Sequence, residues 1–202
     1  MNNKEKIKRI IHEKIMCKNF IESIAKLQID YDIGFPLARE IYFENNLNYA
    51  KKYFEEKKRF EFIDYWAVYG GIIGVESYIW QLEKIITEKK RRYPNTKIRW
   101  RESYMIETLQ MVIKTLESGC LISKPDMYKS SVDKIVVDYE RGTLLLPLQS
   151  IPGITENIAN LIVTEREKKK FNSIEDFRRR INVKLQTLHK IDQYKMFANR
   201  NY

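Results

Sequence analysis

The sequence contains few of the residues that mark secreted, fibrous or membrane-spanning proteins. Its two cysteines, Cys17 and Cys120, are too few and too far apart for a disulfide framework or a zinc knuckle. Five prolines and seven glycines leave no collagen-like or linker-like stretch. No apolar run is long enough to span a bilayer, and the charged segment Met1–Ile15 lacks the apolar core of a signal peptide. We therefore expect a cytoplasmic protein without a membrane partner.

Positive charge, by contrast, is abundant. The 202 residues include 37 Lys and Arg against 27 Asp and Glu, which gives a formal net charge of +10. A surplus of this kind favours an anionic partner, with nucleic acid ahead of a membrane surface. Basic residues are dense in the segment 84–101. Any single one of these charges is explained by a helix end exposed to solvent. The cluster as a whole has an alternative interpretation, a surface that faces phosphates.

The spacing of apolar residues predicts a mostly α fold. One segment changes period: short β-prone runs on either side of Glu140-Arg141-Gly142 predict a small two-stranded β-hairpin. Gly119 is expected to end the helix that precedes the hairpin. Ser173 is expected to cap a later helix, and Phe171 and Phe177 next to this cap are expected to lie in the core. Helical periodicity is found in residues 4–29, 37–58, 73–92 and 103–118, and again after the hairpin to about residue 190.

The clearest local motif is Ile151-Pro152-Gly153-Ile154-Thr155, which is typical of a helix-hairpin-helix element. Glycine allows a tight turn, and amides at the next helix N-terminus can hold a DNA phosphate without reading sequence. The alternative is a hairpin kept for packing. Thr155 stands where the motif has its second glycine, and a β-branched residue is unfavourable there if the position needs a positive φ. The residues expected to contact duplex DNA are Gly153, Ile154, Thr155, Lys168, Lys169, Lys170, Arg178 and Arg179, with Arg180 close by.

No catalytic constellation is predicted. Asp30 and Asp32 form a lone carboxylate pair, whereas two-metal chemistry needs several acids that converge on one site. His12 and His189 are isolated, and there is no Gly-rich phosphate loop. We therefore expect no catalytic residue, metal or cofactor in this chain, and a nuclease or repair enzyme is the least favoured class.

The stretch from Leu144 through Ser173-Ile174-Glu175-Asp176-Phe177 resembles the C-terminal helix-hairpin-helix region of the PolC-type DNA polymerase III α subunit. Residues 109–125 are similar to the helix and turn that precede that region. Further upstream, Phe35-Pro36-Leu37-Ala38-Arg39 resembles the Phe-Pro-Lys-Ala-His motif of the family's fingers segment. Two charged positions of that motif are Leu37 and Arg39 here, so Arg39 is the one candidate for a nucleotide phosphate contact. The resemblance implies that the palm, with its catalytic carboxylates, would lie before Met1.

A short motif near the end of the sequence, Gln193-Tyr194-Lys195-Met196-Phe197, resembles bacterial sliding-clamp ligands, in which Gln and two variable residues precede Leu or Met and then Phe. A short extended tail can insert Met196 and Phe197 into a preformed apolar groove while the Gln193 amide hydrogen-bonds at its rim. The alternative is that Phe197 folds back onto the preceding helix. This motif predicts the β sliding clamp as a partner.

These observations predict a mostly α chain in three parts: a degenerate fingers-like helical region at residues 1–100, a helix-hairpin-helix DNA-binding region with a small β-hairpin at 101–190, and a clamp-binding tail at 191–202. The predicted function is that of a DNA-replication protein that binds duplex DNA and the clamp without its own polymerase active site. A separately encoded palm-containing subunit would then be a further partner. The alternative is a stand-alone replication modulator that competes for host clamp or DNA.

Overall fold

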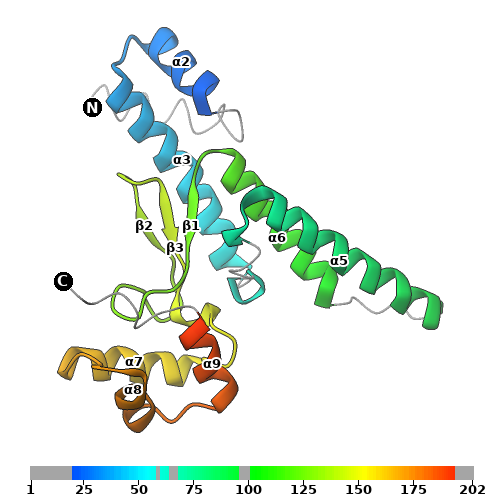
Figure 1. Cartoon of the computed structure of the whole chain (residues 1–202). Helices are drawn as coiled ribbons and strands as arrows, with labels where there is room; N and C mark the ends of the chain where they lie inside the picture. Colours follow the sequence, from blue (N-terminus) through cyan, green and yellow to red (C-terminus); the bar gives the residue numbers. More distant parts are fainter. Residues whose placement is uncertain (1–19, 58–59, 64–67, 96–100, 194–202) are drawn as a thin grey trace.

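The computed structural model describes residues 20–57, 60–63, 68–95 and 101–193, and Figure 1 shows their arrangement. The fold is mostly α with a small sheet, as the sequence predicts. Much of the predicted helix 4–29, and the residues Met196 and Phe197, lie outside the described residues. The N-terminal elements are α2 (Phe20–Tyr31), α3 (Phe35–Glu56), the 3-10 turn η1 (Phe60–Phe62), α5 (Gly71–Arg92) and α6 (Arg101–Glu117).

Helix α3 is the central helix of this first part. Pro36 stands in its first turn, where a missing N–H costs nothing. Its residues Ile41, Leu47 and Phe54 are fully buried. Helices α5 and α6 pack against each other and extend as a long pair to one side of the molecule (Figure 1). After α6, Gly119 has a φ of +74°, which confirms the predicted glycine stop.

The predicted β-hairpin is present, and a third strand extends it. Strand β2 (Val136–Asp138) pairs antiparallel with β3 (Thr143–Leu145), and β1 (Leu121–Ser123) pairs parallel with β3, so the order is β1-β3-β2. Strand β1 was not predicted from the sequence. A strand of three residues is too short to show an alternating pattern, and its place depends on pairing with residues about 20 positions further along the chain.

The buried residues form two hydrophobic cores. The first joins the N-terminal helices to the sheet, whose Ile122 and Leu144 belong to it. The second lies under the C-terminal elements, with Met127, Phe171 and Phe177 among its members, so the predicted burial of both phenylalanines is confirmed. Those C-terminal elements are the 3-10 turn η2 (Leu148–Ser150), α7 (Glu156–Lys168), α8 (Ile174–Arg180) and α9 (Leu185–Gln193).

Helix α8 begins at the cap that the sequence predicts. The Ser173 side chain accepts a hydrogen bond from the backbone N–H of Asp176 at 3.2 Å. The Asp176 carboxylate in turn accepts one from the backbone N–H of Asn172 at 3.1 Å. Two donors at the start of the helix are thereby satisfied. Among the helices that the structure describes, none combines the length and the apolar character needed to cross a bilayer.

Candidate nucleic-acid interface

The turn between η2 and α7 depends on glycine at position 153. Gly153 has a φ of +90°, which L-residues with a side chain rarely adopt. A Cβ built on Gly153 would also lie only 2.1 Å from Oγ1 of Thr187 in α9. Both the backbone conformation and the close approach of α9 therefore require glycine here.

The next two residues differ in what they present to the surface. Ile154 is buried in the second core, and its backbone N–H donates to the carbonyl of Ile151 at 3.0 Å. Thr155 is the N-cap of α7, with a φ of −78°, and its hydroxyl accepts a hydrogen bond from the N–H of Ile158 at 3.4 Å. The position does not need a positive φ, so the β-branched residue fits without strain.

The hairpin leaves several backbone donors available. Within the described residues, the amides of Gly153, Thr155 and Glu156 have no hydrogen-bond acceptor. Two of them stand at the N-terminus of α7, where the aligned peptide dipoles favour an anion. Glu156 is itself an exposed acid in the first turn of that helix, and its charge weakens the attraction for a phosphate.

Two open grooves flank the hairpin, and Pro152 and Gly153 line both of them. The first has a volume of about 600 Å³, and its basic residue is Arg101, whose guanidinium lies over the Phe62 ring at 5.5 Å. The second has a volume of about 510 Å³ and is bounded on one side by α9. The hairpin thus forms the ridge between two grooves that are each open to an extended ligand.

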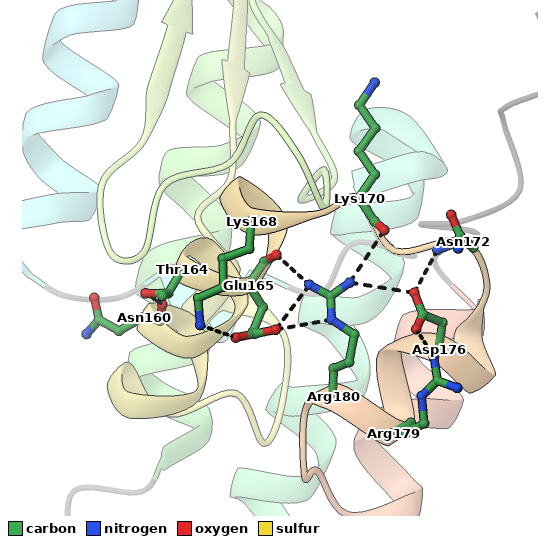
Figure 2. Close-up of polar contacts among 9 residues, drawn as sticks. All are labelled: Asn160, Thr164, Glu165, Lys168, Lys170, Asn172, Asp176, Arg179 and Arg180. Carbon is green, nitrogen blue, oxygen red and sulfur yellow. Dashed lines mark hydrogen bonds and ion pairs between the residues drawn. The ribbon is translucent and has the colours of Figure 1, made fainter.

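The basic residues predicted to assist the hairpin lie at the other end of α7. This helix has 13 residues, so Lys168 is about 18 Å from the hairpin at 1.5 Å per residue. The Lys168 ammonium is 2.7 Å from the Glu165 carboxylate, and Arg179 is 2.6 Å from Asp176 (Figure 2). Lys169, Lys170 and Arg178 are exposed. The structure therefore does not gather the hairpin and the basic residues around one phosphate.

Arg180 has a structural role, because it joins the end of α7 to α8. Its side chain is 16% exposed and lies 3.1 Å from the Glu165 carboxylate and 3.6 Å from that of Asp176. It also donates to the backbone carbonyls of Glu165 and Lys170, and its guanidinium lies 4.3 Å from the centre of the Phe171 ring. Figure 2 shows the guanidinium between the two carboxylates.

The two carboxylates around Arg180 are held in the ionised form. Hydrogen bonds from Lys168 and then from Arg180 lower the pKa of Glu165. The pKa of Asp176 is lowered chiefly by the backbone N–H of Asn172, with Arg179 as a smaller cause. These acids neutralise part of the basic charge that the sequence shows in this region.

Other basic residues named from the sequence are likewise engaged within the protein. Arg39 donates to the backbone carbonyl of Glu140 at 3.0 Å, and its guanidinium lies 5.2 Å from the Phe43 ring, so it holds the turn between β2 and β3. In the segment 84–101, Arg91 and Arg92 lie within 3.0 Å of Glu88, and Lys97 and Arg99 lie outside the described residues. In the described part of the chain, no three acids, histidines or cysteines gather in a way that would hold a metal.

Two basic residues beside the hairpin, Lys184 and Lys190, were not predicted from the sequence. They line the groove beside α9, together with Gln186, His189 and Gln193. A signal for Lys190 exists in the sequence, since residues 186, 189, 190 and 193 have the i, i+3, i+4, i+7 spacing of one helix face. Gln193, the first residue of the predicted clamp motif, is exposed at the end of α9.

Comparison with known proteins first defines the class of the C-terminal part. Residues 119–201 match the family model of the helix-hairpin-helix motif. The chain is also 33% identical over 116 residues to DNA polymerase III PolC-type of Streptococcus agalactiae serotype III (strain NEM316), which covers 57% of this chain and 8% of that protein. It is 32% identical over 94 residues to the proteins of the same name from Bacillus subtilis (strain 168) and Ureaplasma parvum serovar 3 (strain ATCC 700970), which covers 46% of this chain and 6% of each.

These similarities confirm the resemblance to the C-terminal helix-hairpin-helix region of PolC-type DNA polymerase III. The matched segment covers less than a tenth of the length of these relatives. Their activity, substrates and partners therefore apply to this chain only as proposals.

Proposed function

We propose that this chain is a DNA-replication protein that binds duplex DNA through its helix-hairpin-helix region and carries no polymerase active site of its own. The observation that carries the proposal is the hairpin at Gly153, which has unpaired amides and lies between two grooves, in a segment that matches the helix-hairpin-helix model. Such amides hold a phosphate oxygen and do not touch base edges, so the binding is independent of DNA sequence. The net charge of +10 supplies the long-range attraction.

Binding should weaken steeply with salt, because each cation placed on a phosphate releases counterions. Replacing Lys168–Lys170 with glutamine should reduce the slope of log affinity against log salt by about 2 to 3. The measurement is a fluorescence anisotropy titration with a short duplex at several salt concentrations. A triple glutamine variant of Lys26, Lys129 and Lys134, which are exposed lysines outside this cluster, removes the same charge. Equal slopes in the two triple variants would place the DNA contact elsewhere.

We propose further that the tail binds the bacterial β sliding clamp through Gln193, Met196 and Phe197. The motif has the spacing of clamp ligands, and it starts at an exposed residue where α9 ends. Apolar side chains at the Met and Phe positions of such a motif insert into a partner groove and supply most of the binding energy.

The tail predicts a large effect from a single substitution. Phe197→Ala should weaken binding to the clamp by about 30-fold, since loss of a buried aromatic anchor costs about 2 kcal/mol or more. Gln193→Ala should weaken it less. Tyr194→Ala changes a variable position of the motif and serves as the matched control. Calorimetric titration of the purified clamp distinguishes them, and a wild-type chain that shows no binding at tens of micromolar would exclude the clamp as a partner.

Two roles are compatible with these contacts. The chain could act beside a separately encoded palm-containing subunit, or it could be a modulator that competes for the clamp or the DNA of a host polymerase. Adding the chain to a clamp-dependent primer-extension reaction separates them, because a competitor inhibits extension and a missing subunit restores it when the palm-containing protein is present.

A further inference from the structure

We infer that the groove beside α9 is a second site for the sugar-phosphate backbone of duplex DNA, formed by Lys184, Thr187 and Lys190 next to Gly153. The inference rests on the proposed DNA binding and adds to it a set of residues that the hairpin motif does not contain. On this inference the DNA backbone lies on the α9 side of the hairpin, about the length of α7 away from the predicted cluster at Lys168–Lys170.

The wall of the groove is polar and basic. Helix α9 turns one continuous polar face toward the groove, while Leu188 and Ile191 on its other side are buried in the second core. The ionisable residues that line the groove, among those the structure describes, are Lys184, His189 and Lys190, all basic. No aspartate or glutamate of the described ranges lines it. A groove with cations and amides but without a carboxylate fits an anionic ligand.

The two lysines of the groove have no acidic partner among the residues that the structure describes. Within the described part of the chain, Lys184 and Lys190 form no ion pair or side-chain hydrogen bond, in contrast to Lys168 and Arg179 at the far end of α7. An unpaired lysine can neutralise a DNA phosphate, and so release the cation condensed on it, without losing a contact inside the protein. The sequence has basic residues both at the far end of α7 and in this groove. Those in the groove are therefore more available to bind a phosphate.

The side chain of Thr187 adds a hydrogen-bond donor to the groove. This residue is only 3% exposed, yet it lines the groove. Its hydroxyl has no hydrogen-bond partner among the described residues. Because Oγ1 lies 2.1 Å from the position that a Cβ of Gly153 would take, the hydroxyl is placed directly against the hairpin. A phosphate oxygen in the groove would satisfy this donor together with the hairpin amides.

The dimensions of the groove match a nucleic-acid backbone. The polar face of α9 runs from Gln186 to Gln193, a rise of about 10 Å. Neighbouring phosphates of one B-form strand lie about 7 Å apart, because each step combines a 3.4 Å rise with a rotation about the axis, so this face runs beside about two consecutive phosphates. The hairpin meets one phosphate of this stretch, and the lysines meet the phosphates next to it.

A double variant tests the site. Lys184→Gln with Lys190→Gln should lower the slope of log affinity against log salt by about 2, since two phosphate contacts are lost. The matched control is Lys129→Gln with Lys134→Gln, which removes equal charge from exposed positions outside both grooves. If the wild type binds the duplex and both double variants change the salt slope equally, this site is overturned and the proposed DNA binding is left intact. Absence of duplex binding by the wild type would overturn both.

A second pair of variants tests the hydroxyl without changing charge. Thr187→Val keeps the branched shape and removes the donor, and Thr187→Ser keeps the donor. We expect the valine variant to bind duplex DNA about 5-fold to 10-fold more weakly, and the serine variant to stay within about 2-fold of the wild type. Thermal unfolding of both variants confirms that the fold is kept. Equal affinity of the valine variant and the wild type would remove Thr187 from the site.

Discussion

Replacing Gly153 with alanine should unfold the C-terminal core at a lower temperature and abolish hairpin-dependent DNA binding. The φ of +90° is costly for alanine, and its Cβ would lie 2.1 Å from Thr187 Oγ1, so α9 or the hairpin must move. We expect a loss of about 2 to 4 kcal/mol in the free energy of unfolding. Chemical denaturation measures this loss, and anisotropy with a short duplex measures binding under conditions where the variant is folded.

A control and a double variant separate the two causes of this effect. Gly34→Ala should be tolerated, because a Cβ at Gly34 meets its nearest neighbour, Pro36 Cδ, at an ordinary 3.7 Å. Adding Thr187→Ala to Gly153→Ala removes the clashing hydroxyl and should restore part of the stability, which gives a favourable coupling energy in a double-mutant cycle. Unchanged stability and DNA binding in Gly153→Ala would contradict the requirement for glycine at this turn.

The features that could be predicted from the sequence are those set by neighbouring residues. The Gly153 turn, the Ser173 cap and the β2–β3 hairpin each depend on a few adjacent side chains, and the structure shows all three. The burial of Phe171 and Phe177 follows from their place beside short amphipathic helices. Local features of this kind can be predicted because the conformational propensities of the residues and their packing in the fold favour the same structure.

The features that could not be predicted depend on residues far apart in the sequence. Strand β1 is defined by its pairing with β3, and the approach of Thr187 to Gly153 joins positions 34 residues apart. The sequence shows that Lys168 and Arg179 are basic, but it does not show that Glu165 and Asp176 pair with them. A count of basic residues therefore overstated the charge at the far end of α7 and overlooked the unpaired lysines beside the hairpin.

The second large effect is expected at Arg180, which stabilises the contact between α7 and α8. Arg180→Gln removes contacts to two carboxylates, two backbone carbonyls and the Phe171 ring (Figure 2). We expect a loss of about 2 kcal/mol in the free energy of unfolding, because several charge-assisted hydrogen bonds are lost at a side chain that is mostly shielded from water. Arg178→Gln removes the same charge from an exposed position of the same helix and should change stability by less than about 0.5 kcal/mol.

Arg180→Gln should also change how the stability of the protein depends on pH. The folded-state pKa values of Glu165 and Asp176 lie below their ordinary values of 4.5 and 3.8, so the folded form binds fewer protons than the unfolded form as acid is added. Their contribution is therefore complete above the ordinary values and is lost as the pH falls through the lowered ones. In Arg180→Gln the acid-induced loss of stability should be shallower, and it should not vanish, because Lys168 and the Asn172 amide still lower the two pKa values. Denaturation at neutral pH and between about pH 5 and pH 3 measures this; parallel curves for the variant and the wild type would mean that Arg180 does not interact with the ionised carboxylates.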